Sequence, residues 1–234
     1  PEGGVFLLLG VLCGIHREGR IIEAAAAAAG TPAMVRCSGA SAANAARGAR
    51  ELVEAGATRL LSFGVAGGLA DDARPGDLLT PERVLDQCDG DWAADPEWLA
   101  ALRAAWPEGR PDAVLGVDMA ATTIGQKVFL GAAFPAAVAV DMESHHLARA
   151  AAEAGLPFLC VRAVADDRRS LLPRAAMAGV GPAGDERPHR VLLSLLYRPH
   201  EIKALIRLAR ASGRAFRTLG RVGRAGPCLG VGGA

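Results

Sequence analysis

The stretch that most constrains the fold of this 234-residue chain lies between residues 138 and 167. An apolar run ends at Asp141, a helical pattern follows through Ala152, and a second apolar run reaches the pair Asp166 and Asp167. Strand, helix and strand in so short a stretch predict a crossover unit. We expect its two strands to be parallel neighbours, so that the carboxylates of Glu143 and Asp166 meet at one edge of a sheet.

Further apolar runs predict the other strands of this sheet, and alanine-rich or amphipathic patterns between them predict helices. We therefore expect one α/β domain over residues 1–185, with three layers and a mixed, largely parallel central sheet flanked by helices. A basic helical extension, residues 186–234, is expected to dock on it. The predicted strands are Val5–Leu12, Ala33–Cys37, Arg59–Phe63, Leu78–Leu85 and Ala113–Val117, and the predicted helices include Ile21–Ala29, Ala42–Glu54 and Glu97–Ala105.

Two connections of this pattern are candidates for ligand contact. Residues 14–20 are predicted to form a loop at the carboxyl edge of the sheet, with Glu18 in it; alternatively, Glu18 is only an acidic residue in a first helical turn. The run Gly64-Val65-Ala66-Gly67-Gly68 lets the backbone pass close to a ligand or another strand. It lacks the spacing of a dinucleotide loop and of a P-loop, so we expect neither NAD nor a nucleoside triphosphate.

The five cysteines are scattered and lack C-x-x-C spacing. This pattern is typical of reduced packing residues in a cytosolic protein, and it predicts neither a disulfide framework nor a zinc site. The longest N-terminal apolar run, from Val5 to Cys13, is too short for a transmembrane helix and lacks a basic leader.

The C-terminal part is basic: from Glu186 onward the sequence has ten Lys or Arg residues and only two acidic residues, both Glu. Between Ile202 and Arg221 six cations recur at helical spacing and form one stripe, opposite a largely apolar face. The pattern predicts a basic amphipathic helix. It is either a surface helix docked on the domain or a contact with anionic lipid headgroups, and nucleic acid is disfavoured because no aromatic stacking platform accompanies the charge.

The paired carboxylates fit two interpretations. Two carboxylates at one sheet edge can perform acid–base chemistry if their surroundings separate their pKa values. They are equally typical of helix caps and surface ion pairs.

Several motifs together are more specific. Val140-Asp141-Met142-Glu143, a helix, and the run from Phe158 to Asp166 follow Ser38-Gly39, the run from Ser62 to Leu69, and Pro75-Gly76-Asp77. Their sequence and order resemble the nucleoside phosphorylase and nucleosidase superfamily over residues 8–167. The late motifs and the basic extension look most like the hopanoid-associated branch, which is implicated in removing adenine from adenosylhopane.

The resemblance implies a role for each matching residue. Met142 packs against the ribose, and Glu143 accepts hydrogen bonds from its 2′- and 3′-hydroxyls. Asp166 protonates purine N7 so that adenine leaves as a neutral base, and Glu18 matches the carboxylate that activates water. The resemblance also places substrate contacts at Gly64, Val65, Ala120 and Arg162, and it implies no metal and no cofactor.

Three departures from the family bear on the reaction type. Relatives carry a serine at Val65, a serine at Ala165 and a base-stacking aromatic residue at Ala120. In phosphorylases the first of these serines helps to bind phosphate, which valine cannot do. The remaining phosphate-binding candidates are His16, Arg17 and Arg36. We therefore favour hydrolysis over phosphorolysis, in which phosphate would be the co-substrate.

These observations predict cleavage of the N-glycosidic bond of an adenine nucleoside, closest to adenosylhopane or a similar 5′-alkylated adenosine. The alternatives are phosphorolysis of a purine nucleoside, a methylthioadenosine-type nucleosidase, and a non-catalytic membrane-surface binding protein. An amphiphilic substrate predicts a cytoplasmic protein that touches the inner membrane surface. The expected membrane contacts are Lys203, Arg207, Arg210, Arg214 and Arg217. Assembly into a homo-oligomer is left open.

Overall fold

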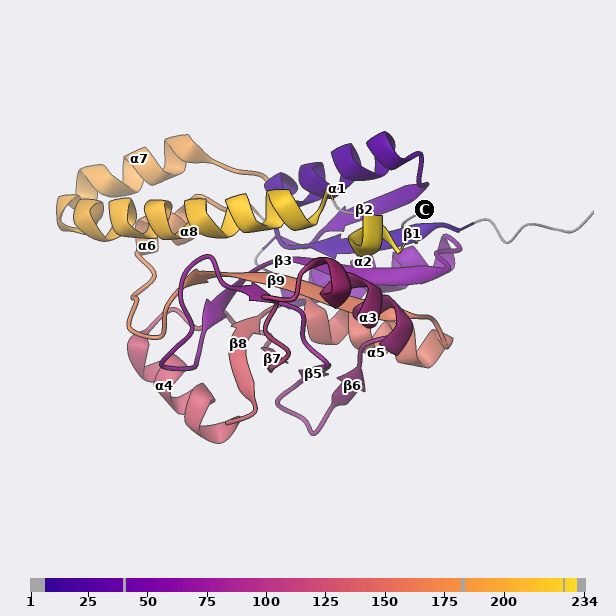
Figure 1. Cartoon of the computed structure of the whole chain (residues 1–234). Helices are drawn as coiled ribbons and strands as arrows, with labels where there is room; N and C mark the ends of the chain where they lie inside the picture. The colour runs from indigo at the N-terminus through magenta and orange to yellow at the C-terminus, as the bar shows by residue number, and fades with distance from the viewer. Residues whose placement is uncertain (1–6, 40, 182–183, 225, 231–234) are drawn as a thin grey trace, which may run out of the picture.

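A mixed sheet of nine strands organises the part of the chain that the structure describes (Figure 1). This computed structural model describes residues 7–39, 41–181, 184–224 and 226–230. The strands are β1 (Leu9–Cys13), β2 (Ala33–Cys37), β3 (Arg59–Gly68), β4 (Leu78–Leu79), β5 (Arg83–Leu85), β6 (Asp91–Ala93), β7 (Ala113–Gly116), β8 (Ala137–Asp141) and β9 (Phe158–Asp166).

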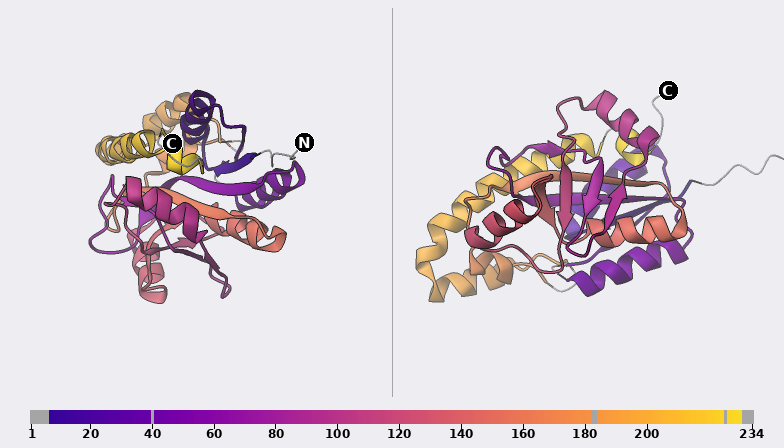
Figure 2. Two further views of the ribbon diagram at one scale, coloured as in Figure 1. Left: turned by 45° about the vertical axis from the view of Figure 1, so that its right-hand side comes forward. Right: turned by 90° about the horizontal axis from the view of Figure 1, so that it is seen from below.

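Helices cover both faces of this sheet and give the predicted three-layer α/β fold (Figures 1 and 2). Side chains of α1 and α8 pack with one face of β1, β3 and β9, whereas those of α2 and α5 pack with the opposite face. The helices are α1 (His16–Ala29), α2 (Ala42–Glu54), α3 (Pro96–Ala105), α4 (Ile124–Ala133), α5 (Ser144–Ala154), α6 (Arg174–Ala178), α7 (Pro188–Tyr197) and α8 (Ile202–Val222), with short 3₁₀ helices η1 (Pro199–Glu201) and η2 (Gly226–Leu229).

Strand β3 is the branch point of the sheet. It pairs in parallel with β1 and with β9, and its last two residues, Gly67 and Gly68, pair antiparallel with β8. The register with β9 shifts between Ala66 and Gly67, where the strand changes partners. The glycine run is therefore part of a strand, and glycine permits the close approach of a second strand at its end.

The predicted strand–helix–strand unit is confirmed as β8, α5 and β9, but the predicted pairing of its strands is wrong. β8 and β9 do not pair with each other, because β3 pairs with both. Their carboxyl ends still lie close together, because the end of β3 joins them.

The predicted loop over residues 14–20 is also wrong, because α1 begins at His16. Glu18 stands in the first turn and its carboxylate accepts hydrogen bonds from the backbone N–H groups of Gly14 and Ile15. These two donors precede the helix, so the side chain fixes the chain where it enters α1.

Two further boundaries differ from expectation. The predicted strand Leu78–Leu85 is two short strands, β4 and β5, separated around Pro81, which has no N–H to donate to a sheet. β1 begins at Leu9, and the predicted start of this strand at Val5 lies outside the described residues. The helix Ala42–Glu54 is confirmed, with Ser41 accepting from the backbone N–H of Asn44 at its start.

The predicted basic helix is confirmed as α8. Its C-terminal half packs on the domain, where Ala215, Leu219 and Val222 are buried, whereas Ile202 and Ile206 near its start are exposed. α7 has no buried residue and contacts α6 (Figure 1). No helix in the described ranges combines the length and apolar character needed to cross a membrane.

Candidate active site

A cavity of about 310 Å³ opens at the carboxyl ends of β1, β3, β8 and β9. This is the edge at which open α/β sheets bind ligands. Six of the predicted site residues line it; Gly64 and Arg162 do not, but they adjoin Glu18 and Glu143, which do. The six are Glu18, Val65, Ala120, Met142, Glu143 and Asp166.

One wall of this cavity is apolar. It is formed by Leu172, Met177 and Val180, which follow β9, and by Leu208 and Phe216 of α8. The C-terminal helix predicted from its basic stripe thus contributes to the same cavity as the carboxylates. The cavity therefore presents ionisable groups on the sheet side and hydrocarbon on the helix side.

Glu18 is buried and held by three backbone donors. Its Oε2 accepts from the N–H groups of Gly14 (2.8 Å) and Ile15 (3.0 Å), and its Oε1 accepts from Val65 (2.8 Å). Burial raises the pKa of this carboxyl above its ordinary value, although Arg162 and the three hydrogen bonds oppose the rise. A carboxylate with a raised pKa is a better proton acceptor at neutral pH than an exposed one.

Glu143 lies next to Glu18 across Gly14. A Cβ atom on Gly14 would stand 3.2 Å from Oε1 of Glu143 and 3.3 Å from Oε2 of Glu18, so only glycine leaves both carboxyl groups their full room. The hydroxyl of Ser38 donates to Glu143 Oε1 at 3.0 Å. Burial raises the pKa of Glu143 to about 8, and the neighbouring Asp141 and Glu18 add to the rise while Arg162 opposes it.

The cation behind these groups is Arg162, in the middle of β9 and fully buried. Its Nε donates to Asp141, and its Nη2 donates to Ser62 Oγ at 2.7 Å and lies 3.6 Å from Glu143 Oε2. Burial alone raises the pKa of Asp141, but Arg162 and hydrogen bonds from Ser144 outweigh it and hold the pKa below its ordinary value. Asp141 is therefore the ionised partner of the arginine.

Gly64 explains how the arginine and Glu18 fit together. A Cβ atom there would lie 2.8 Å from the Glu18 carboxyl carbon and 2.9 Å from Arg162 Nη1, closer than real Cβ atoms approach. The predicted close approach at the glycine run is thus between the backbone and two side chains of the site.

Asp166 has a cation of its own, Lys127 of α4. The ammonium of this fully buried lysine donates to Asp166 and, at 3.0 Å, to the backbone oxygen of Asp167. Burial raises the pKa of Asp166, and Lys127 opposes the rise. The site therefore holds two cation–carboxylate groups, one around Arg162 and one around Lys127.

The prediction from sequence did not identify Lys127, Ser38 or Ser62 as functional side chains. Lys127 stands 39 residues before Asp166, and no motif spacing connects them. One signal was available: Lys127 is the one charged residue in the sequence between Asp118 and Asp141, and a lysine that folds into such a stretch is unusual if it has no partner.

The expected phosphate ligands lie elsewhere. Arg36 pairs with Glu51, and the guanidinium of Arg17 lies 4.0 Å from the centre of the Phe216 ring. Neither residue lines the 310 Å³ cavity, and neither does His16.

A second cavity, of about 730 Å³, adjoins the first and shares Asp166 and Leu208 with it. Three cations of the α8 stripe line this second cavity: Arg207, Arg210 and Arg214. The stripe is therefore divided between a cavity wall and the open surface, which a helical projection of the sequence does not reveal.

Residues 13–196 match the sequence profile of the Phosphorylase superfamily. The match spans most of the chain and includes all eight predicted site residues, so the chain belongs to this superfamily.

Solved structures share the fold at low sequence identity. S-adenosylhomocysteine nucleosidase from Streptococcus pyogenes in complex with 5-methylthiotubericidin has a TM-score of 0.66 and 17% identity, covering 95% of this chain and 98% of that chain. 5′-Methylthioadenosine/S-adenosylhomocysteine nucleosidase from Helicobacter pylori with butyl-thio-DADMe-Immucillin-A has a TM-score of 0.65 and 15% identity, covering 94% of this chain and 98% of that chain. Native futalosine hydrolase from Helicobacter pylori has a TM-score of 0.62 and 17% identity, covering 70% of this chain and 89% of that chain. No curated protein matches the chain.

The raised pKa of Glu143 predicts a stability that depends on pH. Between pH 4.5 and about 8 the unfolded chain releases this proton and the folded chain keeps it, so the free energy of unfolding falls as pH rises through this window. Glu143→Gln removes the effect. We expect the variant to gain stability relative to the parent at pH 8, on the order of a few kcal/mol, and to gain little at pH 4.5.

Urea unfolding at the two pH values measures this difference. Glu153→Gln, on the same helix and outside both cavities, is the matched control and should show no pH-dependent gain. A gain for Glu143→Gln that is equal at both pH values would contradict the predicted protonation state.

Proposed function

We propose that this chain hydrolyses the N-glycosidic bond of an adenine nucleoside. The observation that carries the proposal is the meeting of Glu18, Glu143 and Asp166 in one cavity, each with a different set of partners. Three carboxyl groups in different surroundings can divide proton donation, proton acceptance and sugar binding among them. Membership of the Phosphorylase superfamily supports this class of reaction.

In the proposed reaction, Asp166 gives a proton to N7 of the purine as the bond from the base to C1′ breaks. The bonding electrons leave with the neutral adenine, and the sugar develops oxocarbenium character. Glu143 holds the 2′- and 3′-hydroxyls, with Met142 against the ribose. Glu18 accepts a proton from the water that attacks C1′, and proton transfer to the leaving group contributes roughly 10²–10⁴-fold to such a reaction.

Lys127 has a defined place in this scheme. A protonated Asp166 next to an ammonium is a stronger acid than a carboxyl group that is only buried. The lysine therefore tunes how readily Asp166 releases its proton to the base, and its contact with the Asp167 carbonyl fixes where the ammonium stands.

Two observations support hydrolysis over phosphorolysis. Val65 lines the cavity with an apolar side chain at the position where the phosphorylase resemblance expects a serine. The cations considered as phosphate ligands, His16, Arg17 and Arg36, do not line that cavity. Phosphorolysis remains the alternative reaction of the same site.

The apolar wall supports a substrate with a hydrocarbon group at the 5′ position, such as adenosylhopane. Leu172, Met177, Val180 and Phe216 bring apolar surface to a cavity whose opposite side holds the carboxylates. A methylthioadenosine-type substrate is the smaller alternative.

We further propose peripheral contact with an anionic membrane surface at the inner face of the membrane. The stripe cations Lys203, Arg207, Arg210, Arg214 and Arg217 are exposed. α7, next to α8 in sequence, exposes four large apolar side chains: Leu192, Leu193, Leu196 and Tyr197. Cationic and apolar side chains together are typical of surfaces that bind lipid interfaces.

Asp166→Asn tests the proposed acid. We expect adenine release from a panel of 5′-substituted adenosines, in phosphate-free buffer, to fall roughly 10²–10⁴-fold because the amide cannot supply the proton. Asp167→Asn changes the adjacent aspartate, which lines only the larger cavity, and should retain activity. Undiminished release by Asp166→Asn would overturn the assignment. A sugar 1-phosphate formed only when phosphate is added would establish phosphorolysis instead.

Lys127→Met tests the tuning of Asp166. Without the ammonium the pKa of Asp166 rises further, so the alkaline limb of the adenine-release profile should move to higher pH. Lys203→Met alters the only other lysine of the chain and should leave the limb in place. Lys127→Arg keeps the positive charge and should restore a limb close to that of the parent. An alkaline limb that is unmoved in Lys127→Met would refute the role of this lysine.

Vesicle binding tests the membrane contact. Replacing Arg207, Arg210 and Arg217 by Gln should weaken binding to phosphatidylglycerol vesicles by about 1 kcal/mol for each cation. The control replaces Arg47, Arg50 and Arg83, which lie on α2 and β5, with the same loss of charge. Equal binding by the two triple variants would exclude the stripe as the contact surface.

A further inference from the structure

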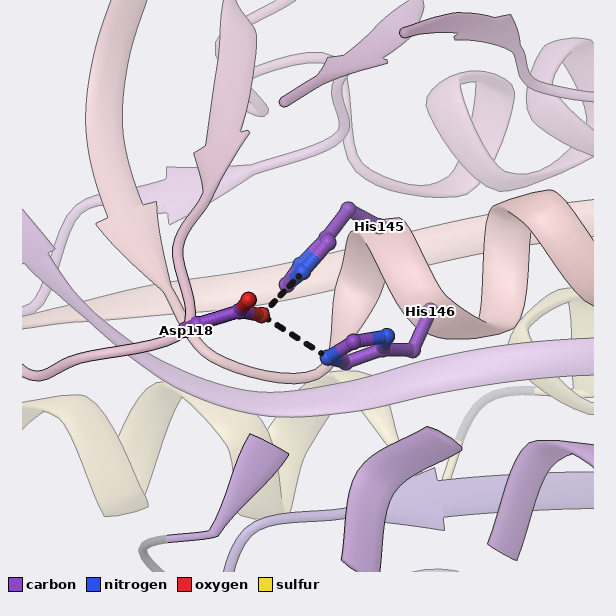
Figure 3. Close-up of side chains that lie close together, drawn as sticks. All are labelled: Asp118, His145 and His146. Atoms are coloured by element: carbon purple, nitrogen blue, oxygen red, sulfur yellow. Dashed lines mark hydrogen bonds and ion pairs between the residues drawn. The ribbon is translucent and has the colours of Figure 1, made fainter. Parts of the chain in front are cut away.

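A cluster of two histidines and an aspartate lies apart from both cavities. Asp118 follows β7, and His145 and His146 are the second and third residues of α5. Figure 3 shows both imidazole rings directed at the Asp118 carboxylate. None of the three residues lines the 310 Å³ or the 730 Å³ cavity, so the catalytic proposal assigns them no task.

The distances within this cluster fit a metal ion. Nε2 of His145 lies 3.1 Å and Nε2 of His146 lies 3.2 Å from the same Asp118 oxygen, and the three atoms all lie within 4.8 Å of one another. A zinc ion bonded at about 2.0 Å to each of two ligands holds them about 3.3 Å apart in tetrahedral geometry. Two of the three separations, 3.1 and 3.2 Å, are close to this value.

The hydrogen bonding of the cluster is incomplete without a further partner. Nε2 of His146 is buried and makes no hydrogen bond in the described part of the chain, despite its short distance from Asp118. Buried ring nitrogens without partners are rare in folded proteins. A bound cation would take the lone pair that Nε2 of His146 leaves unused.

The cluster is open to solvent on one side. The side chain of Asp118 is 69% exposed, so an ion can reach the two buried rings from the Asp118 side.

We propose that Asp118, His145 and His146 bind one divalent transition-metal ion, with water completing its coordination. Zinc is the ion used to test the proposal. Two imidazoles and one carboxylate bind such ions in preference to calcium or magnesium, which prefer ligand sets made of oxygen atoms. This proposal departs from the expectation of no metal, which rested on the cysteine spacing and on the family resemblance; the cluster uses no cysteine.

The ion would connect two segments that shape the candidate active site. Asp118 stands two residues before Ala120, which lines the nucleoside cavity, and His145 stands two residues after Glu143. A bond through the metal fixes the segment after β7 to the start of α5. The ion is outside the cavity, so its role is to position these segments and not to contact the substrate.

The test uses the full chain, stripped with a chelator and dialysed, in a Cys88→Ser background that removes the one exposed cysteine among the described cysteines. Zinc is titrated in competition with a chromophoric chelator, and cobalt is followed by its visible absorption. We expect one equivalent of zinc per chain, a cobalt spectrum that zinc abolishes, and a rise of the thermal midpoint with zinc.

The variants separate this site from adventitious binding. Asp118→Ala, at an exposed position, and His146→Ala should each weaken zinc binding at least about tenfold and lose the rise of the thermal midpoint. His189→Ala and His200→Ala replace exposed histidines of the C-terminal part and should bind as the parent does. The proposal would be overturned if the parent binds no stoichiometric zinc, or if Asp118→Ala and His146→Ala bind zinc with the affinity of the parent; the three residues would then be a hydrogen-bonded cluster only.

Discussion

The buried charge of Arg162 is the constraint on which the rest of the candidate site depends. A guanidinium without solvent contact costs several kcal/mol unless carboxylates and other acceptors compensate for the lost water. Here Asp141 at the end of β8, Ser62 of β3 and Glu143 just before α5 supply them, and Glu18 stands across Gly64 from the same cation. A Cβ atom at position 64 would overlap Glu18 and Arg162, and one at position 14 would crowd Glu143 and Glu18, so glycine at both positions leaves room for these charged groups.

This arrangement gives the acidic groups different pKa values, lowered for Asp141 and raised for Glu143 and Glu18. Asp141 carries the charge that balances Arg162, while burial keeps the pKa values of Glu143 and Glu18 high. Asp166 is separate, since its cation is Lys127 from α4. At one end of the cavity the carboxyl groups therefore surround an arginine that stays charged. At the other end a lysine contacts a single carboxyl group, Asp166, and lowers the pKa of that group. A division of this kind is what a reaction needs when one group binds the sugar and another protonates the base.

The apolar wall shows how a segment beyond the late motifs enters the same site. Phe216 and Leu208 belong to α8, a helix conspicuous in the sequence for its cations, yet both line the cavity. The helix is anchored by Ala215, Leu219 and Val222, and its other faces are left for Arg207, Arg210 and Arg214 to line the larger cavity. One amphipathic helix therefore closes one cavity, borders another and presents charge to solvent.

Local pattern in the sequence determined most of the strands, the limits of α2 and α8, and the carboxylates at the ends of β8 and β9, because burial and helical period act over neighbouring residues. Only the tertiary structure decided which strands pair, as β3 joins β8 and β9 that were expected to pair directly. It also decided the partners of the charged groups: Lys127 reaches Asp166, and Asp118 reaches His145, across 39 and 27 residues. Such contacts follow from how the chain closes on itself, and the stabilisation of a buried charge depends on distance in space, which spacing along the chain does not report.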